Sequence, residues 1–543
     1  DLGQHALFGR VEPGQEVAHR HRIAQMRVAH PLQLARILAR LGQARGVGAM
    51  AVVHAGLGKH VGQGARGAGL VHPDRPLGVT DQRLELVGRG DGDIRVQTNG
   101  LIGAVGAAVE ASTGGDILLE LNAATNNPVI ADTTGGAGTL QVDLRARAAA
   151  LELSSGSGLM TVNLLPGANV VRLETDAQGD AVINHRAGAT QSLPNRTDQT
   201  FAFLNAVAEA VTTINVLSPL LAKASLEPYV GSSRPYIRGF GDGNYVLNNR
   251  ALINSAFDFS ASTGGLNFDN HGADGVTDAA SWIFSGVTEF SAGDDTLRNH
   301  VGATIVASFS ETYQIFFDGF PSEVVTSEMH FHEGEDRILN EGTLIIGDAR
   351  FRPVASLLGP PIVHSEARAF YTAFSGLEDF DNQGLIVFGT WVQDEPIRDL
   401  ASGDPICQQL ATRTRSCREA LGVGDTDAEP STVLSMPGTH FVGGAGSTLL
   451  MDVMLGRGLA QRDCVQRSGA STFFRLPGAD CLDLSSGSTE GQTQVVLRDR
   501  EPNDLGAYNP DGIVIVDVSG GDSAAGHFVM SADSDGFDPS IGA

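Results

Sequence analysis

The chain contains 543 residues, of which 68 are Gly, and Phe, Trp and Tyr together make up only 6% of it. Its formal net charge of −26 at pH 7 argues against a nucleic-acid partner, because phosphates attract proteins with an excess of Lys and Arg. The scarcity of large side chains and the abundance of Gly argue against a compact globular enzyme and favour many short strands joined by turns.

Residues 1–90 differ from the rest of the chain. They carry 12 basic and 6 acidic side chains, whereas the remaining residues carry 25 and 57. A helical pattern over residues 16–43 is interrupted at Pro31, which lacks the backbone N–H that a helix interior needs. Two interpretations stay open: a genuine basic module, helical or disordered, or a stretch translated from a wrong start or frame. We assign this segment no function.

From about residue 91, short β-type runs follow one another, each bounded by Gly, Asn or Asp. In residues 140–144, Leu-Gln-Val-Asp-Leu, apolar and polar residues alternate, which turns one set of side chains inward and the other outward. The pattern predicts strands through residues 91–433, interrupted at about 393–432 by an insertion. Residues 201–225 fit either a helix or two longer strands, and Pro219 limits a helix there.

One phrase recurs in the middle of the chain: an acidic residue, an apolar residue, then Asn followed closely by Gly, and a β-type run. Its Asn residues stand at positions 270, 299, 340 and 382, so the last two intervals are 41 and 42 residues. We interpret each of these intervals as two rungs of about 20 residues in a solenoid. Ordinary hairpin turns of an antiparallel protein are the alternative interpretation.

Each phrase is predicted to form a corner of an all-β solenoid, because Asn and Gly tolerate the left-handed backbone region. Stacked coils would pair in parallel, bury a narrow apolar core and align the Asn side chains in a hydrogen-bonded ladder. The predicted corner residues are Asn270, Gly272, Asn299, Asn340, Gly342, Asn382 and Gly384.

The four cysteines, Cys407, Cys417, Cys464 and Cys481, lie close together in sequence, and none stands in a zinc-binding spacing. The simplest pairing joins Cys407 to Cys417 and Cys464 to Cys481. Such bonds would imply an oxidising compartment. Four unpaired thiols are the alternative.

Two polar groups raise the question of chemistry. His330 and His332 would share a face of a strand and, with Glu333, suggest a metal site, but no further ligands follow and a solvated acidic face is preferred. Asp294 and Asp295 resemble the paired carboxylates of β-helical glycoside hydrolases, but no basic pair follows them. We therefore predict no catalytic, cofactor-binding or metal-binding residue.

Three pieces of sequence stand in a specific order near the C-terminus. They are Pro437-Gly438 with Phe441-Val442 and Gly443-Gly444; then Asp480, Leu482, Gly487, Gly491, Thr493 and Val495; then residues 512–518 with Gly520, Gly521 and Phe528. This order resembles the C-terminal passenger region of autotransporters, the type V secreted surface proteins of Gram-negative bacteria. With the recurring Asn phrases, the resemblance covers about residues 260–543.

The resemblance implies a right-handed parallel β-helix, with residues 434–543 helping to nucleate folding during export. It also implies a location at the cell surface or outer membrane of a Gram-negative bacterium, or secretion from it. Because the chain ends at Ala543 before any alternating membrane strands, we expect the family's outer-membrane β-barrel to be missing from it.

The implied role is a non-catalytic stalk or adhesion scaffold without a cofactor. Its partners would be ligands on host cells, matrix or neighbouring cells. A β-helical glycoside hydrolase or polysaccharide lyase is the alternative function.

Overall fold

The computed structural model describes residues 51–55, 84–87, 92–98, 109–125, 127–187, 203–221, 235–272, 280–284, 286–307, 325–346, 370–388, 432–453, 466–468, 472–474, 479–499, 513–532 and 534. The elements in these ranges are all β-strands. The chain divides into two units, Asp1–Gly48 and Ala49–Ala543, and every described residue belongs to the second. The predicted helix at residues 16–43 and nearly all of the insertion at 393–432 lie outside the described residues.

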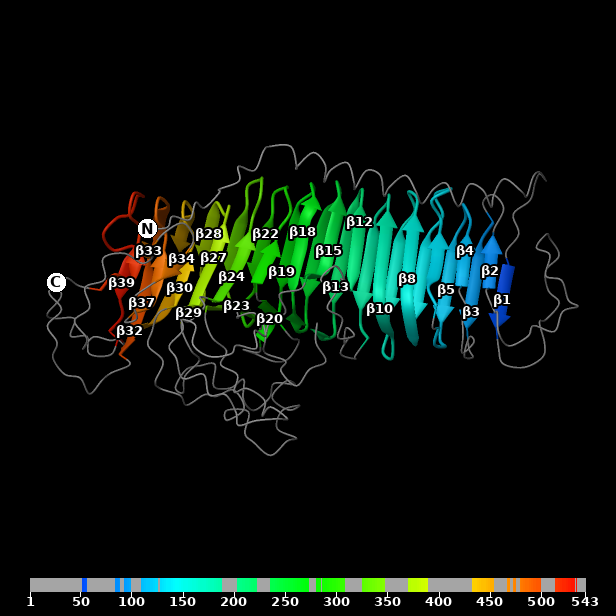
Figure 1. Cartoon of the computed structure of the whole chain (residues 1–543), viewed down its shortest axis with the longest axis horizontal. Coiled ribbons are helices and arrows are strands. Elements are labelled where there is room, and N and C mark those ends of the chain that lie inside the picture. Colours follow the sequence, from blue (N-terminus) through cyan, green and yellow to red (C-terminus); the bar gives the residue numbers. More distant parts are fainter. Residues whose placement is uncertain are drawn as a thin grey trace, which may run out of the picture. The chain divides into compact units, whose positions relative to one another are not determined.

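Three parallel sheets run along the second unit, with their strands stacked side by side (Figure 1). Sheet A has 14 strands: β1 (Ala51–Ala55), β3 (Ile94–Thr98), β5 (Ile117–Leu121), β7 (Leu140–Leu144), β9 (Met160–Leu164), β11 (Ala181–His185), β13 (Val211–Val216), β16 (Asn244–Asn249), β19 (Leu266–Asn270), β22 (Thr296–Asn299), β25 (Arg337–Asn340), β28 (Asp379–Asn382), β31 (His440–Gly443) and β36 (Ser488–Gly491).

Sheet B also has 14 strands: β2 (Leu84–Val87), β4 (Val109–Ser112), β6 (Val129–Asp132), β8 (Arg147–Ser155), β10 (Asn169–Ala177), β12 (Leu204–Ala208), β15 (Pro235–Gly241), β18 (Ala256–Ser262), β21 (Gly286–Glu289), β24 (Val325–His330), β27 (Phe370–Ser375), β30 (Val433–Ser435), β35 (Cys481–Asp483) and β38 (Val516–Asp517).

Sheet C has 9 strands: β14 (Leu220–Leu221), β17 (Ile253–Asn254), β20 (Ala280–Phe284), β23 (Thr304–Ala307), β26 (Thr343–Ile346), β29 (Leu385–Phe388), β32 (Thr448–Val453), β37 (Thr493–Asp499) and β39 (Phe528–Met530). A separate antiparallel pair consists of β33 (Gln466–Ser468) and β34 (Thr472–Phe474).

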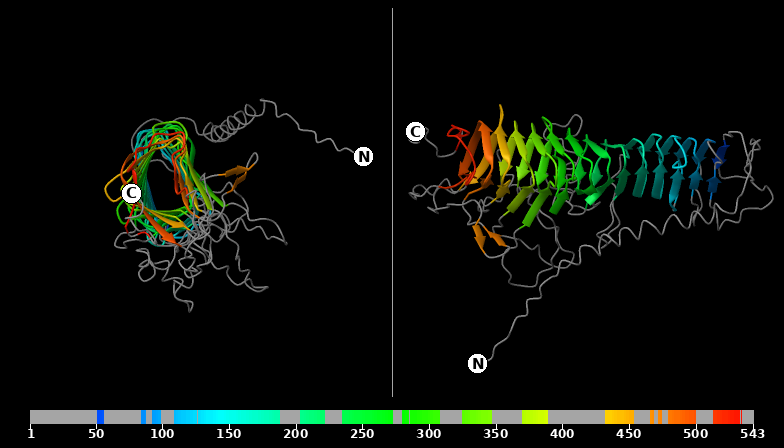
Figure 2. Two further views of the ribbon diagram at one scale, coloured as in Figure 1. Left: turned by 90° about the vertical axis from the view of Figure 1, so that its left-hand side faces the viewer. Right: turned by 90° about the horizontal axis from the view of Figure 1, so that it is seen from above.

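The chain winds as a helix of β-strands. Each coil passes through sheet B and then sheet A, and from β14 onward also through sheet C, before returning to sheet B one level further on. Seen along the stack, the sheets enclose the interior (Figure 2). This arrangement confirms the prediction of an all-β parallel solenoid and excludes antiparallel hairpins for the three long sheets. Residues 203–221 contribute β12, β13 and β14 rather than a helix.

The interpretation of two rungs per interval of about 41 residues is wrong. The register pairs Asn299 directly with Asn340, and Asn340 directly with Asn382, so each interval is a single coil. The shortest coils nearby do span about 20 residues, as from Leu144 to Leu164. The longer ones contain extra residues between a strand of sheet C and the next strand of sheet B, such as residues 308–324 and 347–369, outside the described ranges.

The core changes character where sheet C begins. No Phe, Trp or Tyr occurs between Phe8 and Phe201, and the buried residues up to Ala187 are mainly Val, Leu, Ile and Ala. Beyond that point the interior holds aromatic rings, as where Phe257 stacks on Trp282 with centroids 4.9 Å apart. The Trp282 indole N–H donates to the backbone oxygen of Ser255 at 3.0 Å, which satisfies a buried donor. A third wall therefore provides room for rings that the two-strand coils do not contain.

A column of buried amides ends the strands of sheet A. Each Asn side chain donates to the next coil, from Asn249 to Asn270 (2.8 Å), Asn299 (2.9 Å), Asn340 (2.8 Å) and Asn382 (2.8 Å). The column, here called the inner ladder, continues through the hydroxyls of Ser447 (2.7 Å) and Thr493 (2.8 Å). Because an amide both donates and accepts, each member satisfies its neighbours on both sides.

The corner glycines serve two different physical needs. Gly272 has a φ of 75°, in the left-handed region that the sequence pattern predicts. Gly342 and Gly384 have no positive φ, contrary to the expected reason for their presence. A Cβ at Gly384 would instead lie closer than 3.0 Å to the carbonyl oxygen of Gly342, and one at Gly342 would collide with the carbonyl oxygen of Ala303. These two glycines allow close stacking of successive coils.

Replacing Asn340 by Asp should destabilise the protein by about 1–3 kcal/mol, because the side chain loses its donor and faces the buried Asn382 oxygen with another oxygen. The measurement is the urea midpoint of unfolding at pH 7. The exposed Gln383→Ala variant is the control and should change stability by less than about 0.5 kcal/mol. Equal midpoints for both variants would contradict a stabilising role of the inner ladder.

Gly384→Ala should cost about 1–3 kcal/mol, because the added methyl group overlaps a backbone oxygen that cannot move without separating two coils. Gly135→Ala is the matched control, since a Cβ at Gly135 meets nothing within 4 Å. Thermal unfolding of both variants tests the difference. A Gly384→Ala variant as stable as Gly135→Ala would show that the corner relaxes freely.

Candidate functional site

Polar side chains on the outer surface of sheet A also form columns. The half-buried residues one position before the strand ends are joined by amide hydrogen bonds of 2.7–2.9 Å, from Asn163 to Asp143, Asn184 to Asn163, Asn215 to Asn184 and Asn248 to Asn215. The register places Asp269 next in this column, opposite Asn248. A ladder of Asn amides that begins at the Asp143 carboxylate therefore leads to a second carboxylate, Asp269.

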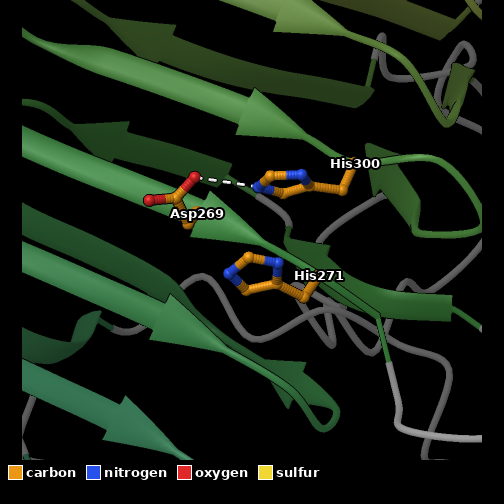
Figure 3. Close-up of side chains that lie close together, drawn as sticks. All are labelled: Asp269, His271 and His300. Carbon is orange, nitrogen blue, oxygen red and sulfur yellow. Dashed lines mark hydrogen bonds and ion pairs between the residues drawn. The ribbon is translucent and has the colours of Figure 1, made fainter.

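Two histidines lie beside that carboxylate on adjacent coils (Figure 3). Asp269 is the penultimate residue of β19, His271 directly follows β19, and His300 directly follows β22 on the next coil. Backbone hydrogen bonds hold both histidines in the stack: His271 N donates to Asn249 O at 2.9 Å, and His300 N donates to Asn270 O at 3.0 Å. Each histidine follows an Asn of the inner ladder, whose side chain points inward and leaves the imidazole outside.

Asp269, His271 and His300 form a compact group, here called the Asp-His-His cluster. His300 Nε2 lies 2.9 Å from Asp269 Oδ1, and the two imidazole rings stack with centroids 4.1 Å apart at 19°. One potential ligand atom from each residue lies within 4.8 Å of the others, and no other such trio exists in the described ranges. All three residues are partly buried, so their polar atoms remain accessible from one side.

Charged neighbours border the cluster. On the next coil, Glu341 accepts two hydrogen bonds from Arg298 (2.9 and 3.2 Å), and its Oε2 lies 3.8 Å from His300 Nδ1. Burial lowers the pKa of His271 below its usual 6.5, and the charges of His300 and Arg250 lower it further, against the opposing effect of Asp269. The surroundings of His271 therefore favour its neutral form over the imidazolium.

The histidines singled out from the sequence lie in a different place. His330, at the end of β24, contacts Glu328 Oε2 through Nε2 (2.7 Å) and Glu289 Oε2 through Nδ1 (3.3 Å). His332 reaches the same Glu289 oxygen through Nε2 at 3.1 Å, and Glu333 is exposed. Both imidazoles thus interact with carboxylates of the outer face, and they belong to no trio of converging ligand atoms among the described residues.

Asp294 and Asp295 face opposite ways. Asp294 is exposed and accepts a hydrogen bond from the backbone N–H of Glu335 at 3.0 Å. Asp295 is fully buried, where Oδ1 accepts from Leu266 N (2.6 Å) and Oδ2 from Ser291 N (2.8 Å). The Ser291 hydroxyl also donates to Asp295 Oδ1. The two neighbours therefore do not converge on one ligand as the carboxylates of a glycoside hydrolase do.

Asp295 has a buried carboxylate neighbour from the next coil instead. Its backbone N–H donates to Oδ1 of Asp336 at 2.8 Å, while Asp336 Oδ2 is buried without a hydrogen-bond partner. Burial, the main cause, raises the pKa of Asp336 to about 7, and the charges of Asp295, Glu378 and Asp294 act in the same direction. Asp336 thus exchanges a proton near neutral pH inside the wall of the solenoid.

Of the four cysteines, Cys481 is the one within the described residues, and it is disulfide-bonded and fully buried in β35. Its bonding partner lies outside the described residues, as do Cys407, Cys417 and Cys464. The predicted pairings therefore stay predictions, whereas an unpaired thiol at Cys481 is excluded.

The Asp-His-His cluster was missed from the sequence although both of its histidines stand inside the recurring phrases. Each directly follows a ladder Asn, as Asn270-His271 and Asn299-His300. That shared position was the available signal, because residues at equivalent positions of adjacent coils stack. The successive coils differ in length, so the sequence spacing alone does not show that these two positions are neighbours. The strand register shows it.

No protein-family model, curated protein or solved structure matches this chain. Among the described residues no helix is long and apolar enough to cross a membrane.

Asp336→Asn should change how stability depends on pH. In the unfolded chain Asp336 ionises near pH 4, whereas in the folded chain its pKa is about 7. Between these values the folded state holds the proton more tightly, so the contribution of Asp336 to stability is lost as pH rises through about 7. The neutral Asn does not suffer this loss, and the variant should gain stability relative to the wild type from pH 5 to pH 8.

Urea midpoints measured across that pH range test the effect. Glu333→Gln removes the same charge at an exposed position nearby that does not contribute to the Asp336 pKa, and it serves as the control. Parallel midpoint curves for the wild type and Asp336→Asn would show that the buried carboxyl does not change its protonation state in this range.

Proposed function

We propose that this chain is an autotransporter-type passenger that acts at the cell surface as a non-catalytic stalk or adhesion scaffold. The observation that carries the proposal is the parallel β-helix itself, whose successive coils are joined by backbone pairing and by the inner ladder. Such a wall presents an extended surface that is held in place from coil to coil. Its ligands would be components of host cells, matrix or neighbouring cells. Function cannot be derived from fold alone, so the proposal rests also on the C-terminal motifs.

The C-terminal motif residues have structural roles that support this proposal. Asp480 is fully buried and its carboxylate accepts from Thr432 N (2.9 Å) and Asp452 N (2.8 Å), which joins three separate segments. Thr493 ends the inner ladder, and Gly491 has a φ of 73° directly above Gly443. These coils are held by buried polar contacts as well as by apolar packing.

Two further properties support a location outside the cytoplasm. Cys481 is disulfide-bonded, and disulfides persist mainly in oxidising compartments. The net charge of −26 keeps a long β-rich protein soluble and discourages lateral association of its walls. The enzymatic alternative has lost its supporting observation, because Asp294 and Asp295 point apart.

A surface-display experiment tests the proposal. The full chain, preceded by a secretion signal and fused to an autotransporter translocator, should become accessible to antibody and added protease on intact Gram-negative cells. Cells displaying it should also adhere better than cells with the translocator alone to immobilised matrix proteins or to one another. Retention of the chain inside the cells would overturn the proposed location, and display without adhesion would overturn the adhesive role.

Two matched variants test the role of the C-terminal coils. Phe441→Ala in β31 and Phe268→Ala in β19 each empty a fully buried site on sheet A and should destabilise by about 3–5 kcal/mol. If residues 434–543 nucleate folding during export, Phe441→Ala should lower the amount of folded chain at the surface several-fold more than Phe268→Ala does. Equal losses would show that the C-terminal coils have no special part in export.

A further inference from the structure

We propose that Asp269, His271 and His300 bind a zinc ion that joins two adjacent coils of the solenoid. The donor set is two imidazole nitrogens and one carboxylate oxygen, which is a set that Zn²⁺ accepts with a fourth position left for water. Asp269 and His271 come from the coil of β19, and His300 comes from the coil of β22. The site is independent of the proposed passenger function, because it follows from local geometry alone.

The distances fit a tetrahedral ion. With Zn–N and Zn–O bonds of about 2.0–2.1 Å, neighbouring ligand atoms of a tetrahedral site lie roughly 3.3 Å apart. Asp269 Oδ1 and His300 Nε2 are already 2.9 Å apart, and the His271 nitrogen lies within 4.8 Å of both. Figure 3 shows a nitrogen of each ring on the side that faces Asp269. Binding requires His271 to rotate out of its stacked arrangement so that its lone pair converges with the other two ligands.

The surroundings favour a metal ligand at His300. Imidazole ligands usually have a carboxylate or carbonyl near their second nitrogen, which fixes the ring and raises its basicity. Glu341 Oε2, held by Arg298, lies on the side of this second nitrogen, 3.8 Å from His300 Nδ1, which is an electrostatic contact rather than a hydrogen bond. The same ion pair compensates the positive charge of Arg298, which is the guanidinium nearest to Glu341 on this surface.

On the outer surface of sheet A, the ion would link the same two coils that the inner ladder joins inside the wall. Inside the wall, Asn270 and Asn299 already join the same two coils by a side-chain hydrogen bond of 2.9 Å. The site brings together residues 29 positions apart through the register of β19 and β22, so it does not exist in the unfolded chain. Zinc therefore binds the folded state selectively and raises the unfolding midpoint.

The test is calorimetric titration of the metal-free full chain with Zn²⁺ alone, at pH 7.5. Residues 1–90 contain 7 further histidines, so the result is taken from the comparison between variants and not from the total number of bound ions. The double variant His271→Ala, His300→Ala should lose one bound Zn²⁺ relative to the wild type. The matched control His330→Ala, His332→Ala removes the same number of imidazoles one or two coils away and should retain that ion.

Variants with side chains of similar size separate a loss of Zn²⁺ binding from a loss of folded protein. Asp269→Asn and His300→Gln should weaken Zn²⁺ binding at least tenfold, and Glu341→Gln should weaken it less than either, because Glu341 contacts His300 Nδ1 at 3.8 Å without a hydrogen bond. Co²⁺ added to the wild type should give the visible absorption of a tetrahedral site, and Asp269→Asn should abolish it. Equal Zn²⁺ stoichiometry and affinity in the wild type and the His271→Ala, His300→Ala variant would overturn the proposal, as would an equal loss in the His330→Ala, His332→Ala control.

Discussion

Parallel hydrogen bonding between successive coils in a nearly constant register is the constraint on which the rest of this structure depends. Among the described strand pairs, the register shifts only between β15 and β18 and between β20 and β23. Neighbouring strands lie about 4.8 Å apart, so each side chain contacts the residues at the same position of the coils on either side. A polar residue turned inward must therefore find its partner in its own column. The inner ladder meets this demand because an amide can donate to one neighbour and accept from the other.

Because the strands must pair in register, the chain varies mainly in the residue types of the inner column and in the length of the segments between strands. The inner column is aliphatic at Leu144 and Leu164, holds His185 and then Val216 on the next two coils, and consists of Asn residues from Asn249 onward. Burial lowers the pKa of His185 to about 4, so this imidazole is neutral, and its Nδ1 lies 3.1 Å from the Ser218 oxygen. The change from aliphatic to polar column accompanies the appearance of sheet C and of the buried aromatic rings. Additional residues enter between strands, at 308–324 and 347–369 between sheets C and B and at 273–279 between sheets A and C, where they leave the strands paired with those of the neighbouring coils.

The fold was predictable because its signals are local and repeated. Alternation within residues 140–144 identifies a strand, and the recurring Asn positions identify equivalent corners. Coil length was not predictable, because extra residues at a corner change the spacing between Asn299 and Asn340 without changing the register. The same difficulty hid the Asp-His-His cluster. Proximity in sequence pointed to His330 and His332, whereas His300 lies 29 positions after His271 along the chain and on the adjacent coil.

Stacking of equivalent positions also means that charge must be arranged along columns as well as across surfaces. The residue that follows each sheet A strand is Arg250, then His271, His300 and Glu341 on successive coils. A column of four like charges at this spacing would repel strongly, and the observed order instead passes from a cation through two titratable imidazoles to a carboxylate. Two residues of the neighbouring column extend the pattern. Asp269 contacts His300, and Arg298 contacts Glu341. A solenoid therefore assembles a polar site from single residues of consecutive coils, and a change in the length of one corner leaves that site intact as long as the register holds.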